Sequence, residues 1–252
     1  MFQETNKKII IYTMNATIME RRATLFVGSP IKITGENIPV FITTFGKMGL
    51  YPSVNKGIGI KVTPKGVEHE DVISLDMKYL DETLKVSIGP DRIDIVSKKT
   101  DDNWDSFRDF IMKISAEITS QFSNDITRYA QCASIRLKLD SKHAQEAYRK
   151  LFVDNDSNPV EWQLRKVHRT QLLSSDNKYS VIVNNVYDIS RNNVIVNGEN
   201  LSNIVTLDMD INTLVGSDIN SLKQIQELFW VSSAATIQTA IDNYYSILSD
   251  EK

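Results

Sequence analysis

Cysteine is nearly absent from this chain, and histidine is scarce. Cys132 is the single cysteine among 252 residues, so no disulfide can form within the chain. A lone thiol favours a reducing compartment, because disulfides accumulate in secreted proteins. One cysteine and three dispersed histidines do not supply the four ligands of a Cys/His zinc site. No activating base can be identified for Cys132, which favours a buried structural thiol in a cytoplasmic protein.

Long hydrophobic runs are also missing. No stretch approaches the ~20 apolar residues that a transmembrane helix needs. The apolar run that begins at Ile9 is too short for the core of a signal peptide with a cleavage site. The formal net charge of −3 excludes a global basic field that would attract nucleic acid or anionic lipid. We therefore expect a soluble protein without a membrane partner.

The overall composition is that of an ordinary globular protein. Hydrophobic residues make up 41% of the chain and charged residues 24%. A chain of 252 residues can bury a sizeable core, either as one large domain or as two small lobes.

The strongest local pattern predicts an amphipathic helix over residues 100–122. Asp102 is a suitable N-cap, and Asp105 places a carboxylate in the first turn. Apolar residues then recur at steps of three and four, which stacks them along one helical face. That face must pack against something large, most simply a sheet. Its residues are Trp104, Phe107, Ile111, Ile114, Ile118 and Phe122.

Short β-rich segments separated by Gly, Pro and Asn occupy much of the remaining chain, which is typical of antiparallel meanders. The clearest hairpin turns at Gly89-Pro90-Asp91, and Asn197-Gly198 is a second strong hairpin turn. Further helices are predicted over 142–152, capped by Ser141, and from a capping box at Ser221 to Leu248. The predicted strands are 9–14, 23–27, 31–34, 40–45, 58–62, 72–80, 84–88, 93–95, 129–139, 160–173, 179–183, 186–189, 194–196 and 204–211.

The predicted fold class is therefore α+β, with mostly antiparallel sheet covered by two long amphipathic helices. Strands followed by a long helix occur twice along the chain. This repetition raises the hypothesis of a single domain built from two similar lobes. Residues 1–125 would form the N-terminal strands and helix, and residues 126–252 the C-terminal ones.

The densest basic segment lies in a predicted strand and contains Arg165, Lys166, His168 and Arg169. Alternation would place Arg165 and Arg169 on one face with Val167, and Lys166 and His168 on the other. Such residues can bind phosphates, which makes a nucleic-acid interface one hypothesis. The alternative is an exposed strand whose charges prevent edge-to-edge pairing.

Asp208 and Asp210 lie two residues apart, which places both carboxylates on one face of a predicted strand. Paired carboxylates can bind the divalent metals used in phosphoryl transfer. A solvent-facing strand surface explains the same alternation without any metal. No third acidic ligand or nucleophile can be placed beside the pair from the sequence.

The order of these features resembles a sporadically distributed family of uncharacterised bacterial proteins of about 250 residues. The resemblance spans residues 72–248. It rests on the hairpin over 84–93, on Trp104 and Phe107 opening a helix, and on the late strand 206–210 before a terminal helix. The arginine-containing strand at 128–132 departs from the family's aromatic and glycine-rich pattern. The resemblance implies a bacterial protein and assigns no activity.

No set of residues that could together form a catalytic site can be identified, whereas apolar residues patterned to form a hydrophobic core are abundant. The leading hypothesis is a non-catalytic binding or protein-interaction protein that needs no cofactor and acts on a protein partner or as a homodimer. The first alternative is a nucleic-acid-associated protein using Arg165, Lys166, His168 and Arg169. The second is a divalent-metal-dependent enzyme using Asp208 and Asp210.

Overall fold

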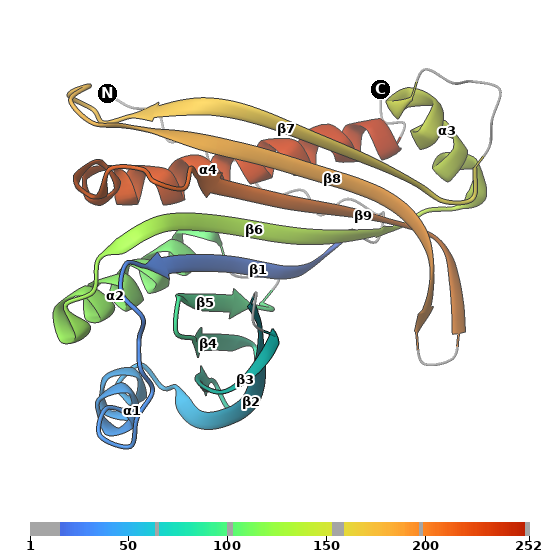
Figure 1. Cartoon of the computed structure of the whole chain (residues 1–252). Helices are drawn as coiled ribbons and strands as arrows, with labels where there is room; N and C mark the ends of the chain where they lie inside the picture. The colour runs from blue at the N-terminus through green and yellow to red at the C-terminus, as the bar shows by residue number, and fades with distance from the viewer. Residues whose placement is uncertain (1–15, 64–65, 100–102, 153–158, 197–198, 250–252) are drawn as a thin grey trace.

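The computed structural model describes residues 16–63, 66–99, 103–152, 159–196 and 199–249 of the chain. Within them, nine strands form one antiparallel sheet in the order β2-β3-β4-β5-β1-β6-β9-β8-β7, accompanied by four helices (Figure 1). The predicted α+β class with antiparallel sheet is confirmed. The elements are β1 (Ala16–Val27), α1 (Ile38–Gly46), β2 (Tyr51–Thr63), β3 (Gly66–Lys78), β4 (Leu84–Ile88), β5 (Arg92–Ser97), α2 (Trp104–Phe122), β6 (Ile126–Lys138), α3 (Ser141–Leu151), β7 (Trp162–Leu173), β8 (Ser180–Val196), β9 (Glu199–Thr213) and α4 (Ile219–Ser249).

The sheet has two unlike faces around its centre. Alternate residues of β6 and β9 are buried on the side where α4 packs, because successive strand side chains point to opposite faces. α4 contacts β6, β7, β8 and β9, and it also touches α2 and α3. Figure 1 shows α2 and α4 on the same side of these strands. The buried residues on this face include Tyr129, Ala133, Ile135, Leu207, Met209 and Ile211.

Helix α2 follows the predicted apolar stripe. Its buried residues include Phe107, Ile111, Ile114 and Ile118. The predicted N-cap was wrong: Asn103 caps the helix by accepting a hydrogen bond from the Ser106 N–H at 2.7 Å, and Asp102 lies outside the described residues. An extended backbone at Asn103 lets its side-chain oxygen reach the free N–H of the first turn.

The predicted strand at 40–45 was wrong, because this segment forms helix α1. Pro39 stands in the first turn, where backbone N–H groups have no acceptor within the helix. The lack of an N–H in proline therefore costs no hydrogen bond there. Phe41 and Phe45 lie one helical turn apart and are fully buried. Phe41 also stacks on Phe122 of α2 with ring centroids 4.1 Å apart. The short strand predicted at 31–34 is not a strand either, although Ile31 and Ile33 are buried.

Two further caps differ from prediction by one to three residues. Asp140, not Ser141, caps α3 by accepting a hydrogen bond from the His143 N–H at 2.8 Å. Asp218, not Ser221, accepts from the first turn of α4, through the Ser221 N–H at 2.7 Å. These hydrogen bonds lower the pKa of both carboxyl groups, since they favour the charged form. The strand predicted at 9–14 lies outside the described residues.

The β8–β9 hairpin extends past the rest of the sheet. β8 pairs with β7 only as far as Arg191, and β9 pairs with β6 only from Ile204 onward. Beyond these positions the two strands pair with each other alone, so they form an arm at the right of Figure 1. The separate short strands predicted at 179–183, 186–189 and 194–196 are therefore parts of one long strand.

Candidate binding face

The sheet face turned away from the helices carries a row of polar side chains contributed by five strands. The register aligns Arg165 of β7 with Asp188 of β8, Asp188 with Asp208 of β9, Asp208 with Ser134 of β6, and Ser134 with Glu20 of β1. Because each of these residues is a direct cross-strand partner of the next, their side chains share one face. Residues as far apart in the sequence as Glu20 and Asp208 thus meet in one line.

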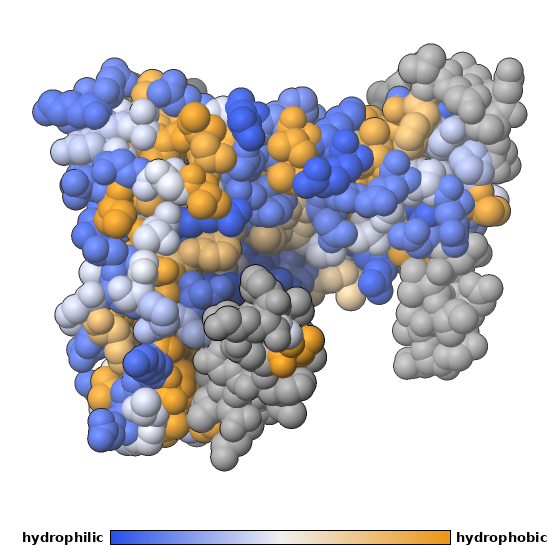
Figure 2. Space-filling model, viewed as in Figure 1, coloured by the Kyte–Doolittle hydropathy of each residue, from blue (hydrophilic) through white to orange (hydrophobic). Residues whose placement is uncertain are grey.

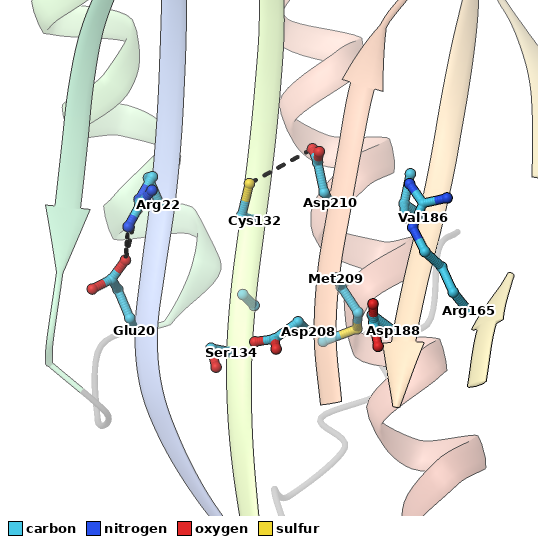
Figure 3. A pocket seen from close by; sticks show the side chains of 11 residues that line it. Glu20, Arg22, Cys132, Ser134, Arg165, Val186, Asp188, Asp208, Met209 and Asp210 are labelled. Atoms are coloured by element: carbon cyan, nitrogen blue, oxygen red, sulfur yellow. Dashed lines mark hydrogen bonds and ion pairs between the residues drawn. The ribbon is translucent and has the colours of Figure 1, made fainter. Parts of the chain in front are cut away.

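A second row runs beside the first. It contains Val167, Val186, Asp210, Cys132 and Arg22, again in direct cross-strand register. Figure 3 shows Arg22, Cys132 and Asp210 of this row on the side of the strands opposite the helices. Apart from Val167, the residues of both rows line an open cavity of about 280 Å³. In the space-filling view this part of the molecule is recessed between its bulkier ends (Figure 2).

Three carboxylates in the cavity form no ion pair with a described residue, although Arg165 lies directly across from Asp188. Asp188 accepts two hydrogen bonds from the Gln163 side-chain amide, at 2.8 and 2.7 Å. Asp210 accepts one from the Cys132 thiol, with a sulfur-to-oxygen distance of 3.6 Å. Asp208 is exposed and lies directly opposite Asp188, a like-charge pairing that destabilises a sheet. By contrast, Glu20 is neutralised by Arg22 at 2.7 Å. The cavity floor is therefore negative.

Cys132 is held in its thiol form. Burial, followed by the negative charge of Asp210 and its hydrogen bond, raises the pKa of Cys132 to about 12. Burial and a neighbouring anion both disfavour the thiolate, which is the nucleophilic form. The sequence predicted a buried structural thiol, whereas the structure leaves Cys132 half-buried at the cavity.

We expect Asp210→Asn to raise the rate of Cys132 alkylation by iodoacetamide several-fold between pH 8 and 10, since removing the anion lowers the thiol pKa. The measurement is the pH dependence of the alkylation rate, followed by mass spectrometry. Asp208→Asn is the matched control, because Asp208 makes no hydrogen bond to the thiol among the described residues. Equal rates for wild type and Asp210→Asn would contradict the assignment.

The four basic residues singled out from the sequence do not form one patch. Arg165 and Arg169 lie on the open face, whereas Lys166 and His168 lie on the face that α4 partly covers, as the alternation predicted. Lys166 is opposite Tyr187, and the His168 ring lies 6.2 Å from the Tyr187 ring. Arg169 donates a hydrogen bond to Asn184 at 3.1 Å. At most two of the four can therefore contact one ligand on the open face.

Asp208 and Asp210 share a face, as the sequence indicated, and the sheet adds Asp188 beside them. Within the part of the chain that the structure describes, no group of three or more His, Cys, Asp or Glu side chains is arranged to hold a metal ion. Sequence reasoning missed Asp188, Glu20 and Arg22, which enter the cavity through strand pairing. The only local indication of this face among the three was the two-residue spacing of Glu20 and Arg22, which places both side chains on the same side of a strand.

No protein-family model matches the chain, and comparison with curated proteins finds no significant match. Among the described residues, the helices include none that is both long and apolar enough to cross a membrane.

Proposed function

We propose that this chain is a non-catalytic protein-interaction module that binds a basic segment of a partner protein on its open sheet face. The observation that carries the proposal is the group of Asp188, Asp208 and Asp210, which faces the cavity and forms no ion pair with a described residue. Lysine or arginine side chains of a partner would supply the missing charge. The scarcity of cysteine supports a cytoplasmic setting for this interaction.

The charge of the face favours protein over nucleic acid as the occupant. The three carboxylates would repel a phosphate backbone at the centre of the face. Arg165 and Arg169 stand on the edge strand β7, while Lys166 and His168 point to the other side. A phosphate ligand would therefore meet two arginines at the rim and an anionic floor, whereas a basic segment would meet complementary charge at the floor.

The test uses a fluorescein-labelled peptide with alternating lysine and glycine, titrated with protein and followed by fluorescence anisotropy. We expect the triple variant Asp188→Asn, Asp208→Asn and Asp210→Asn to bind at least tenfold more weakly, since each charged hydrogen bond contributes about 1.5–3 kcal/mol. The variant should fold at least as stably as wild type, because the Asp188–Asp208 repulsion is removed.

A matched control changes the net charge equally at three exposed helical carboxylates, through Asp109→Asn, Glu227→Gln and Asp242→Asn. This control should retain wild-type affinity. If both triple variants lose affinity equally, or neither does, the open face is not the binding site.

Parallel titrations with a labelled DNA duplex and with Mn²⁺ examine the two alternatives. DNA binding lost in Arg165→Gln with Arg169→Gln, or Mn²⁺ binding lost with Asp208→Asn, would replace the proposal.

We also propose that the domain consists of two similar lobes that meet at the β1–β6 pair. In each half, a central strand is followed by a helix, then by strands that return to pair beside it, then by a long helix. β5 returns to β1 and precedes α2, as β9 returns to β6 and precedes α4. An experimental structure in which residues 16–122 and 126–249 do not superpose over these strands and helices would contradict the proposal.

A further inference from the structure

A second cavity, of about 320 Å³, is formed by α2, α4 and β6. It shares no lining residue with the open-face cavity. Its floor includes Tyr129 of β6. Because side chains alternate along a strand, Tyr129 lies on the helix-covered face of the sheet and Cys132 lies on the opposite face. The two cavities therefore lie on opposite sides of the central strands.

The phenol of Tyr129 is an unpaired polar group in this cavity. Tyr129 is only 1% exposed, and its ring packs against Phe229 and Trp230 with centroids 5.6 and 5.5 Å away. The backbone N–H and C=O of Tyr129 are both bonded to the Thr213 hydroxyl, which fixes the strand at this point. None of the described residues forms a hydrogen bond with the phenol hydroxyl. The hydroxyl is not one of the fully buried polar atoms without a partner, so it is open to the cavity, where a ligand's acceptor can take its hydrogen bond.

The cavity also presents the N–H donors of Lys223 and Gln226, beside the hydroxyls of Ser115, Thr119 and Ser120. The Lys223 ammonium bonds Asp125 at 2.8 Å, and an ammonium carries three N–H donors. The Gln226 amide donates to the Ser115 hydroxyl at 2.6 Å with one of its two N–H groups. These N–H groups suit a ligand that accepts hydrogen bonds, and the Lys223 ammonium, although it is paired with Asp125, has further N–H groups that an anion can accept from.

Apolar side chains form much of the remaining wall, beside the hydroxyls of Thr119 and Ser120. Met112 and Ala116 come from α2, and Ile126 comes from the start of β6. A cavity of this size is at the lower end of the range for small-molecule sites, which suits a ligand of roughly ten non-hydrogen atoms.

We propose that this cavity binds a small aliphatic carboxylate. Its carboxylate accepts hydrogen bonds from the Tyr129 hydroxyl and the Lys223 ammonium, and its alkyl chain lies against Met112, Ala116 and Ile126. The site is independent of the open sheet face and of the proposed protein partner.

Octanoate is the probe for this site, titrated by calorimetry and by the fluorescence of Trp230, which packs on Tyr129. We expect saturable binding of one octanoate per chain. Tyr129→Phe removes only the hydroxyl and should weaken binding about tenfold. Lys223→Gln should weaken binding and reduce its dependence on salt. Tyr244→Phe, at a half-buried tyrosine elsewhere on α4, is the matched control and should bind as wild type does.

Tyr129→Phe should fold at least as stably as wild type, because the hydroxyl that it loses is unpaired. A loss of octanoate binding is then a property of the site and not of misfolding. The proposal is overturned if butyrate, octanoate and laurate all fail to bind saturably. It is also overturned if wild type and Tyr129→Phe bind octanoate equally, or if 1-octanol binds as tightly as octanoate.

Discussion

Replacing Trp230 with alanine is expected to lower the free energy of unfolding by about 3–5 kcal/mol. Trp230 is fully buried on α4 and meets Phe229 and Tyr129 edge-on, with ring centroids 4.9 and 5.5 Å away. These contacts join α4 to the central strand β6. A loss of this size is a large fraction of the 5–15 kcal/mol by which a typical domain is stable. Urea unfolding followed by far-ultraviolet circular dichroism measures it.

Val231→Ala is the control for this prediction. Val231 is the next residue on the same helix, but 43% of it is exposed, so its truncation should change stability by less than about 1 kcal/mol. Alanine is also the better helix former, which offsets part of the lost contact. If Trp230→Ala costs no more than Val231→Ala, the aromatic cluster does not hold α4 on the sheet.

The helix over 104–122 could be predicted because its information is local. Phe107, Ile111, Ile114 and Ile118 repeat with the helical period, and burial follows that period. The same reasoning failed at 38–46, where β-branched residues outweighed Pro39 in the first turn. There the burial of Phe41 and Phe45 decides the outcome. Phe41 stacks on Phe122 of α2, a contact that no local pattern contains.

The candidate site was predictable only strand by strand. Alternation correctly placed Asp208 with Asp210 and separated Arg165 from Lys166. It could not place Asp188 opposite Asp208, or Glu20 opposite Ser134, because strand order and register depend on contacts between distant segments. The cavity therefore follows from the pairing of five strands, and its negative charge could not be predicted from the sequence of any one strand.

Asn124 joins two loops at the boundary between the chain's halves, and Asn124→Asp is the second substitution with a large expected effect. Its side-chain amide donates to the Ser29 carbonyl at 2.6 Å and accepts from the Ser29 N–H at 3.0 Å, and the residue is 6% exposed. An ionised aspartate offers only acceptors, so it would face the Ser29 carbonyl without a proton. We expect a loss of about 2–4 kcal/mol at pH 8.

The loss should shrink in acid, because a protonated aspartate can donate to Ser29 again. The folded protein then binds that proton more tightly than the unfolded chain, so the pKa of the new carboxyl is raised above about 3.9. Stability of the variant is therefore greatest relative to wild type near pH 4, and it falls as the pH rises through the folded pKa. Urea unfolding at pH 4 and pH 8 measures this change. Asn124→Ala, which has no proton to exchange, should differ from wild type equally at both values. A difference between Asn124→Asp and wild type that does not change with pH would show that this amide is not the hydrogen-bonding link between the two loops.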